Sequence, residues 1–131
     1  MKYLLDTCTC IDLFKGSRKV YEKIKSIGRS NIFISEITVA ELYFGAFKSN
    51  NLKHFNEVEQ CMRFFEVVPI TSSIKTYAKT RAQLEASGFR IDDLDLFIAS
   101  TALENDMIVV TSNTKHFFRV PGIKLEDWRE E

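Results

Sequence analysis

Residues 2–7 are Lys2-Tyr3-Leu4-Leu5-Asp6-Thr7, a short apolar run that ends in an acidic and a hydroxyl residue. A continuous apolar run indicates a strand that is buried on both faces, which is typical of parallel sheets in α/β proteins. Similar runs occur at 31–35, 66–70 and 107–111, and a shorter one at 123–125. The sequence therefore predicts four buried strands and a fifth strand at one edge of the sheet.

Helical patterns occupy the segments between these runs, and Ser87-Gly88 is typical of a helix C-terminus. We expect helices at 11–14, 19–27, 38–48, 52–65, 72–86 and 92–104. Because strands that alternate with helices pair in parallel, the predicted fold is a three-layer α/β/α sandwich with a central parallel sheet of four to five strands. No repeat or linker divides the sequence, so we expect residues 1–131 to form a single domain.

Composition limits the classes of function. A hydrophobic content of 45% supports a packed core, and 18 basic against 18 acidic residues leave no overall attraction to nucleic acids or membranes. No apolar run reaches the roughly 18 residues of a membrane span, and Asp6 interrupts any signal-peptide core. The three cysteines, Cys8, Cys10 and Cys61, lack the spacing of a zinc site and are interpreted as reduced thiols that fill core space. We therefore expect a cytoplasmic protein that does not engage a membrane.

Several polar residues fall where strands end or helices begin. Asp6 closes the first strand, and Glu41 lies in the first turn of the helix after the second strand. Asp92 and Asp95 open the helix before the fourth strand, and Asn113 follows that strand. Ligands of open parallel sheets collect beyond the carboxyl ends of the strands. We therefore expect these residues to converge, Asp95 on condition that its helix begins at the same edge.

Each of these residues also has a purely structural interpretation. Thr38 and Glu41 match the spacing of a capping box, in which Glu41 would only bond a backbone N–H. Asp6, Asp92 and Asn113 each suit a helix N-cap or an Asx turn. Capping alone gives no reason for acidic residues to gather at one edge of the sheet, so we favour a shared site.

Gathered carboxylates repel one another unless a cation neutralises them. Oxygen ligands select Mg²⁺ or Mn²⁺, and Mg²⁺ keeps several waters and shares a substrate phosphate. Such a site activates water for attack on a phosphodiester without a side-chain nucleophile. The two histidines, His54 and His116, fit a surface role better than a two-histidine or Ser-His-Asp mechanism, although His116 is near enough to the predicted site to touch a phosphate.

Four blocks of the sequence resemble the motifs of PIN-domain ribonucleases. They are Leu5-Asp6-Thr7, the segment 35–42 with Gly45, the segment 95–102 and the segment 110–117. With the ending at Trp128 they resemble the VapC toxins of bacterial VapBC toxin–antitoxin pairs over the whole span from Tyr3. The resemblance implies a PIN-like fold and a metal-dependent endoribonuclease. It also implies a homodimer and a larger assembly with an inhibitory VapB-like antitoxin.

Carried over position by position, the resemblance implies that Asp6, Glu41 and Asp95 hold Mg²⁺, with Mn²⁺ as a substitute. Asn113 matches a fourth catalytic position at which many relatives carry Asp. This sequence therefore has one negative charge fewer there, and a second metal is expected to bind weakly or only with substrate.

Other positions are expected to assist. Thr7 and Thr111 match hydroxyl positions that orient metal-bound water. Asp92 is a further acid near the site, although an N-cap role suits it better. The basic residues between 15 and 29 could hold the RNA backbone beside an acidic edge, and an exposed helix face explains them equally well. They are Lys15, Arg18, Lys19, Lys23, Lys25 and Arg29.

Two other functions stay open. A PIN domain that only binds RNA or a protein would explain Asn113 in the fourth position. A phospho-acceptor receiver domain is also a small α/β unit, but it needs an acidic pair after the first strand, where this sequence has Asp6 alone.

An antitoxin could inhibit by placing an Arg among the carboxylates. Tyr43, Phe44 and Phe47 are candidates for its groove, for a dimer contact or for the core.

Overall fold

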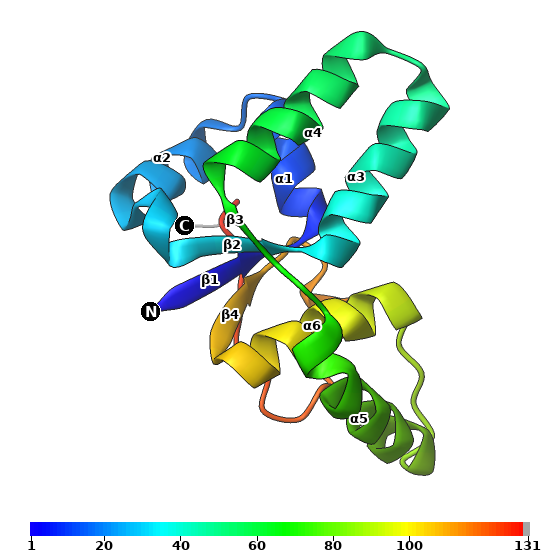
Figure 1. The fold of residues 1–131 in the computed structure, drawn as a ribbon. Coiled ribbons are helices and arrows are strands. Elements are labelled where there is room, and N and C mark those ends of the chain that lie inside the picture. Colours follow the sequence, from blue (N-terminus) through cyan, green and yellow to red (C-terminus); the bar gives the residue numbers. More distant parts are fainter. Residues whose placement is uncertain (130–131) are drawn as a thin grey trace.

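Five short parallel strands form the centre of the molecule (Figure 1). In this computed structural model, which describes residues 1–129, the strands lie in the order β3-β2-β1-β4-β5. Their bounds are β1 Lys2–Leu5, β2 Ile32–Ser35, β3 Glu66–Val68, β4 Met107–Val110 and β5 Leu125–Glu126. All five predicted strands are present. The edge strand β5 lies slightly later in the chain than the predicted 123–125.

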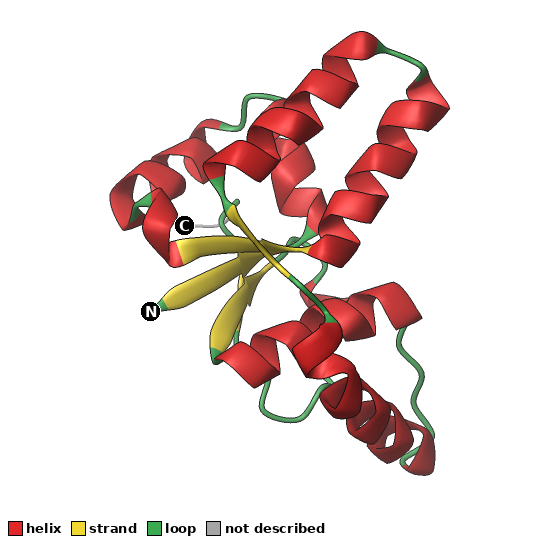
Figure 2. Cartoon of the chain, in the orientation of Figure 1, coloured by secondary structure: helices red, strands yellow, loops and turns green. Residues whose placement is uncertain are grey.

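Helices cover both faces of this sheet (Figure 2). Their bounds are α1 Thr7–Phe14, α2 Arg18–Ile27, α3 Glu36–Ser49, α4 Leu52–Phe64, α5 Ile74–Ala86, α6 Asp93–Asn105 and α7 Thr114–Phe117, with 3-10 turns at Arg29–Asn31 and Thr71–Ser73. Helices α1 to α4 pack on one face, and α5 and α6 pack on the other (Figure 1). The predicted three-layer α/β/α sandwich is confirmed. No helix in residues 1–129 has both the length and the apolar character to cross a membrane.

Neighbouring residues of each strand serve different cores. Leu5 belongs to the core beneath α1 to α4, whereas Leu4 belongs to the core beneath α5 and α6. In the same way Val110 faces the first core and Val109 the second. Because side chains alternate across a strand, a sheet covered on both faces needs apolar residues at successive positions. This explains why the strands appear in the sequence as continuous apolar runs.

Helices α1 and α3 begin two or more residues earlier than the sequence predicts, because a polar residue caps each of them. Asp6 is the N-cap of α1, so this helix begins at Thr7 rather than at residue 11. Ser35 caps α3 by accepting a 3.0 Å hydrogen bond from the backbone N–H of Ile37. Glu41 therefore lies in the second turn of α3 and not in the first as predicted, and the alternative interpretation of Thr38 and Glu41 as a capping box is wrong. The short helix α7 was not predicted.

Candidate active site

The strand order brings the candidate acids to one edge of the sheet. Strand β1 lies between β2 and β4, so the carboxyl ends of these three strands are neighbours. Asp6 follows β1, the helix that carries Glu41 follows β2, and Thr111 follows β4. Helix α6 returns to the start of β4, which places its N-terminal end, with Asp95, at the same edge. The condition that the sequence set for Asp95 is met.

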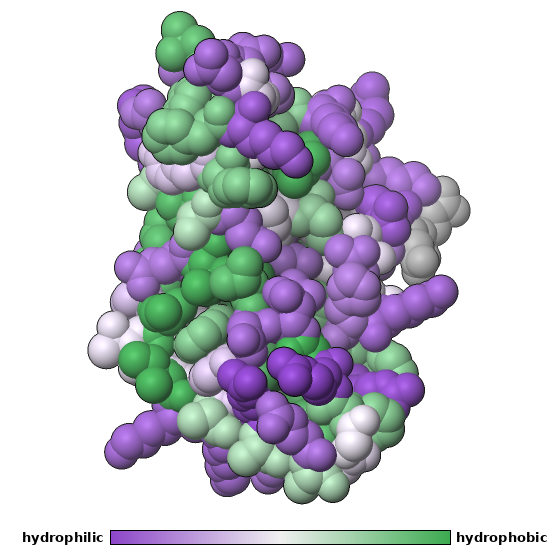
Figure 3. Space-filling model, turned by 90° about the vertical axis from the view of Figure 1, so that its right-hand side faces the viewer, coloured by the Kyte–Doolittle hydropathy of each residue, from purple (hydrophilic) through white to green (hydrophobic). Residues whose placement is uncertain are grey.

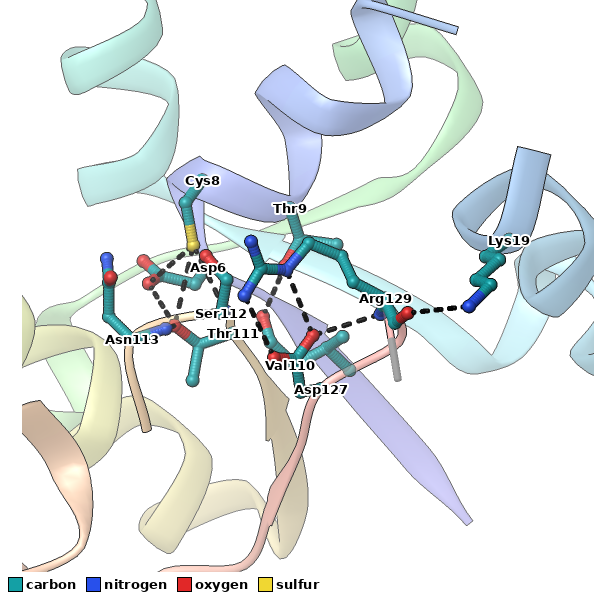
Figure 4. A network of polar contacts seen from close by, with 10 residues as sticks. All are labelled: Asp6, Cys8, Thr9, Lys19, Val110, Thr111, Ser112, Asn113, Asp127 and Arg129. Atoms are coloured by element: carbon teal, nitrogen blue, oxygen red, sulfur yellow. Dashed lines mark hydrogen bonds and ion pairs between the residues drawn. The ribbon is translucent and has the colours of Figure 1, made fainter. Parts of the chain in front are cut away.

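Asp6 is almost fully buried, with 4% of its surface exposed, yet both of its carboxylate oxygens have partners. Oδ1 accepts a 2.8 Å hydrogen bond from the backbone N–H of Thr7. Oδ2 accepts one of 2.8 Å from the Thr111 hydroxyl and a longer one of 3.5 Å from the Cys8 thiol. Figure 4 shows Cys8, Thr111 and Asn113 gathered around this carboxylate. Asp6 is thus held in one orientation by its neighbours.

Glu41 is held by a residue that also contacts Asp6. The hydroxyl of Thr7 donates a 2.6 Å hydrogen bond to Oε1 of Glu41 and lies 3.4 Å from the Thr38 hydroxyl. Burial raises the pKa of Glu41, and the charges of Asp6 and Asp92 raise it further, while the Thr7 bond opposes the shift. The hydrogen bond therefore favours the ionised carboxylate at a site where its surroundings disfavour it.

Asp95 shows the strongest effect of the clustered charge. Its pKa is raised to about 6, first by burial and then by the charges of Asp6, Asp92 and Glu41. The ring of His116 opposes this rise, and its Nδ1 lies 3.5 Å from Oδ2 of Asp95. Four carboxylates from three separate segments therefore act on one another at this edge, which is the convergence that the sequence predicted.

The donor set suits a hard divalent cation. Its groups are carboxylate oxygens, and burial and mutual repulsion destabilise the ionised forms of Glu41 and Asp95, which a cation would relieve. Within residues 1–129, no three acidic, histidine or cysteine side chains form a ready-made metal cage. Carboxylate oxygens of this kind suit Mg²⁺, which keeps several of its waters and binds few carboxylates directly.

The two remaining candidates, Asp92 and Asn113, differ in the bonds that their side chains make. Asp92 caps α6 by accepting a hydrogen bond from the backbone N–H of Leu94, so its structural interpretation holds, although its charge also acts on Asp95. The Asn113 side chain makes no capping bond, and its backbone N–H donates to the Thr111 hydroxyl at 2.9 Å. Asn113 thus stays adjacent to Asp6 through Thr111 without a structural duty for its amide.

Of the six basic residues expected to hold RNA, Lys15, Arg18 and Lys19 differ in where they lie, and Lys15 is the one beside the acids. Lys15 lines the same groove as Glu41. Arg18 lines a different pocket, together with Tyr21 and Glu22. Lys19 donates a 3.2 Å hydrogen bond to the carbonyl oxygen of Arg129, away from the acidic edge (Figure 4).

Cys8 belongs to the cluster around Asp6, which the sequence interpretation missed. Cys10 and Cys61 are buried in the core as predicted, whereas Cys8 is only partly buried. Its sulfur lies 3.5 Å from both Asp6 Oδ2 and the Thr111 hydroxyl, and accepts a 3.4 Å hydrogen bond from the backbone N–H of Ser112. Its position in the first turn of a helix capped by Asp6 was the one available signal.

Comparison with known proteins agrees with this geometry. The PIN domain family matches residues 3–123. The tRNA(fMet)-specific endonuclease VapC of Salmonella typhimurium is 33% identical over 130 residues and Ribonuclease VapC2 of Rickettsia felis is 32% identical over 132, each alignment covering 98% of both chains. The structure of VapBC2 from Rickettsia felis bound to a promoter DNA fragment superposes with a TM-score of 0.90 at 31% identity, covering 98% of this chain and 99% of that one. DNA-bound VapBC from Salmonella typhimurium gives 0.87 at 34% identity, with 98% of each chain covered. The chain therefore belongs to the PIN domain family and, within it, to the VapC ribonuclease toxins of VapBC systems.

Proposed function

We propose that this protein is a Mg²⁺-dependent endoribonuclease that hydrolyses RNA phosphodiester bonds and is inhibited by a cognate VapB-like antitoxin, with Mn²⁺ as an alternative ion. The observation that carries the proposal is the meeting of Asp6, Glu41 and Asp95, in which burial and mutual repulsion raise the pKa values of the latter two. The names of the relatives support ribonuclease activity, and the family assignment argues against a receiver domain.

In this proposal Asp6, Glu41 and Asp95 hold the cation. When bound, Mg²⁺ would supply charge stabilisation to the phosphodiester and lower the pKa of a coordinated water. The chain's own residues orient the acids: Thr7 positions Glu41, and Thr111 positions Asp6. The Asn113 amide would add a neutral polar group beside Asp6 and Thr111. No residue acts as a nucleophile in this scheme.

A groove beside Glu41 is the proposed site of the antitoxin. It lies between α1, α3 and α4, has a volume of about 280 Å³ and is lined mainly by apolar groups, with Lys15 and Glu57 among its charged residues. A peptide in this groove could place an Arg against Glu41 and Asp95, where a bidentate guanidinium would replace the cation's charge. Several structurally similar proteins were solved as VapBC or toxin–antitoxin complexes, which supports a partner of this kind.

Exposed aromatic residues on α3 suggest a second contact. Phe44 and Phe47 are 67% and 71% exposed, although Tyr43 packs against the core. Figure 3 shows apolar surface gathered along one side of a largely hydrophilic face. Apolar clusters of this kind mark interaction surfaces. We therefore assign Phe44 and Phe47 to the contact between the two chains of a homodimer, in which each chain forms one PIN domain. In this proposal the homodimer joins a larger assembly with the antitoxin and acts in the cytoplasm, where it meets RNA.

The test is cleavage of structured RNA, including tRNA, by the purified protein with Mg²⁺ or Mn²⁺ and with excess EDTA. Asp95→Asn should reduce kcat/KM by on the order of 100-fold or more, because it removes a proposed metal ligand. Asp106→Asn is the matched control, since Asp106 ends the same helix at its opposite end and is exposed. Full activity in EDTA or in Asp95→Asn would refute the proposal. RNA binding without cleavage by the wild type would favour an inactive PIN domain.

A further inference from the structure

Two phenylalanines and one arginine form a group at the surface, on the chain segments that adjoin Asp92 and His116. The guanidinium carbon of Arg119 lies 3.8 Å from the ring centroid of Phe89 and 5.0 Å from that of Phe118. Both rings nevertheless remain accessible, with 38% of Phe89 and 59% of Phe118 exposed. Burial of aromatic surface is favourable, so two exposed rings held by a cation indicate a contact surface more than a core contribution.

The same two segments also supply the site. Phe89 lies in the connection between α5 and α6, three residues before Asp92. Phe118 follows α7, two residues after His116, whose ring contacts Asp95. Phe117 lies between His116 and Phe118 in the sequence, is fully buried and anchors α7 in the core. The aromatic group is therefore tied to the acidic edge through short, anchored stretches of chain.

The positive charge of Arg119 is available to a ligand. Among the ion pairs and side-chain hydrogen bonds within residues 1–129, none involves the Arg119 guanidinium, whose contacts are the two rings. Arg90 and Lys115 stand on the same two segments and are exposed. A nucleic acid strand approaching an acidic site needs nearby positive charge to hold its phosphates.

We infer that Phe89, Phe118 and Arg119 form a subsite that stacks an unpaired base of the RNA beside the phosphodiester to be cleaved. Proteins that hold single-stranded RNA stack splayed bases on aromatic rings and arginine planes while cations follow the backbone. The inference rests on the proposed ribonuclease function and adds to it a recognition element for an unpaired nucleotide. Because every base has a stacking face, the subsite selects unpaired structure over a particular base.

The experiment compares Phe118→Leu, which keeps apolar volume but loses the ring, with Phe118→Trp, which keeps it. Phe118→Leu should raise KM for a hairpin RNA with an unpaired loop about tenfold with kcat nearly unchanged, as expected for loss of one stacked base. Phe118→Trp should keep the wild-type KM. Phe64→Leu is the control, because Phe64 is similarly exposed beneath Arg29 at 5.1 Å but lies on α4.

A binding readout separates this inference from the proposed function. In an Asp95→Asn background, the Phe118→Trp indole should be quenched by RNA, whereas the native Trp128 is buried and serves as the background. If the wild type cleaves no RNA, the ribonuclease proposal fails, while quenching still decides whether the subsite stacks a base. An unchanged KM in Phe118→Leu or an unquenched indole overturns the inference. Weaker inhibition by the antitoxin with unchanged KM also overturns it, because the surface would then serve a protein.

Discussion

The hydroxyl of Thr7 donates a 2.6 Å hydrogen bond to Glu41, and the backbone N–H of the same residue donates to Asp6 at 2.8 Å. One residue at the start of α1 thus orients two acids that are 35 positions apart in the chain. Asp6 is in turn linked to the end of β4 by Thr111. The hydroxyl residues of this site therefore set the direction in which its carboxylates can present oxygens.

Replacing Thr7 with valine should disturb Glu41 without emptying space in the site. The Thr7 bond lowers the Glu41 pKa against the effect of burial, so Thr7→Val should raise that pKa further. Misplacement of the acid should lower kcat/KM about tenfold or more. Thr76→Val is a matched control, because Thr76 makes an equally short 2.6 Å bond to Glu104 away from the acidic edge. Equal activity in the two variants would contradict the positioning role.

Asp95→Asn should stabilise the protein at neutral pH even as it removes activity. The pKa of Asp95 is raised from 3.8 to about 6, so the folded state binds more protons than the unfolded state between these values. The free energy of unfolding therefore falls as pH rises through about 6, because the Asp95 carboxyl must ionise in its buried place. Below about pH 4 this carboxyl is protonated in both states, so the destabilisation is absent. We expect a gain on the order of 2 kcal/mol in the free energy of unfolding at pH 8. Urea unfolding at pH 8 and pH 4 measures it, and a gain of equal size at both values would contradict this origin.

Divalent cations should raise the melting temperature of the wild type, because they bind the folded site and relieve its repulsion. A cation present at about ten times its Kd adds about 1.4 kcal/mol. The effect should weaken below about pH 6, where protons compete for Asp95, and EDTA should abolish it. Thermal unfolding with Mg²⁺, Mn²⁺ and EDTA checks this. Asp6→Asn should lose the shift, and a shift of wild-type size in that variant would place the ion elsewhere.

Asn113→Asp should strengthen cation binding, because it adds a carboxylate beside Asp6 and Thr111. We expect Mn²⁺ affinity to rise about tenfold or more, and stability without metal to fall through added repulsion. Mn²⁺ titration by calorimetry gives the affinity. Asn50→Asp is the control, since Asn50 lies at the far end of α3 and is exposed. Unchanged affinity in Asn113→Asp would show that this position does not face the ion.

Local sequence patterns determined the strands and most of the helices of this protein. Apolar runs such as Leu4-Leu5 and Val109-Val110 identify strands with two buried faces, because no other element needs unbroken apolarity over so few residues. Helix starts were less accessible, since Ser35 and Thr38 are both plausible caps and only the folded backbone decides between them. The acids could be assigned to one edge because each follows a strand or lies near the start of a helix.

Only the tertiary structure decided which side chains meet there. The placement of β1 between β2 and β4 brings Thr111 to Asp6 across 105 positions, and it brings Cys8 into the same cluster. Likewise Phe89 meets Arg119 although the two residues are 30 positions apart in the chain. Such contacts depend on strand order and loop path, which periodicity does not encode, and so do the pKa values that burial and neighbouring charges produce.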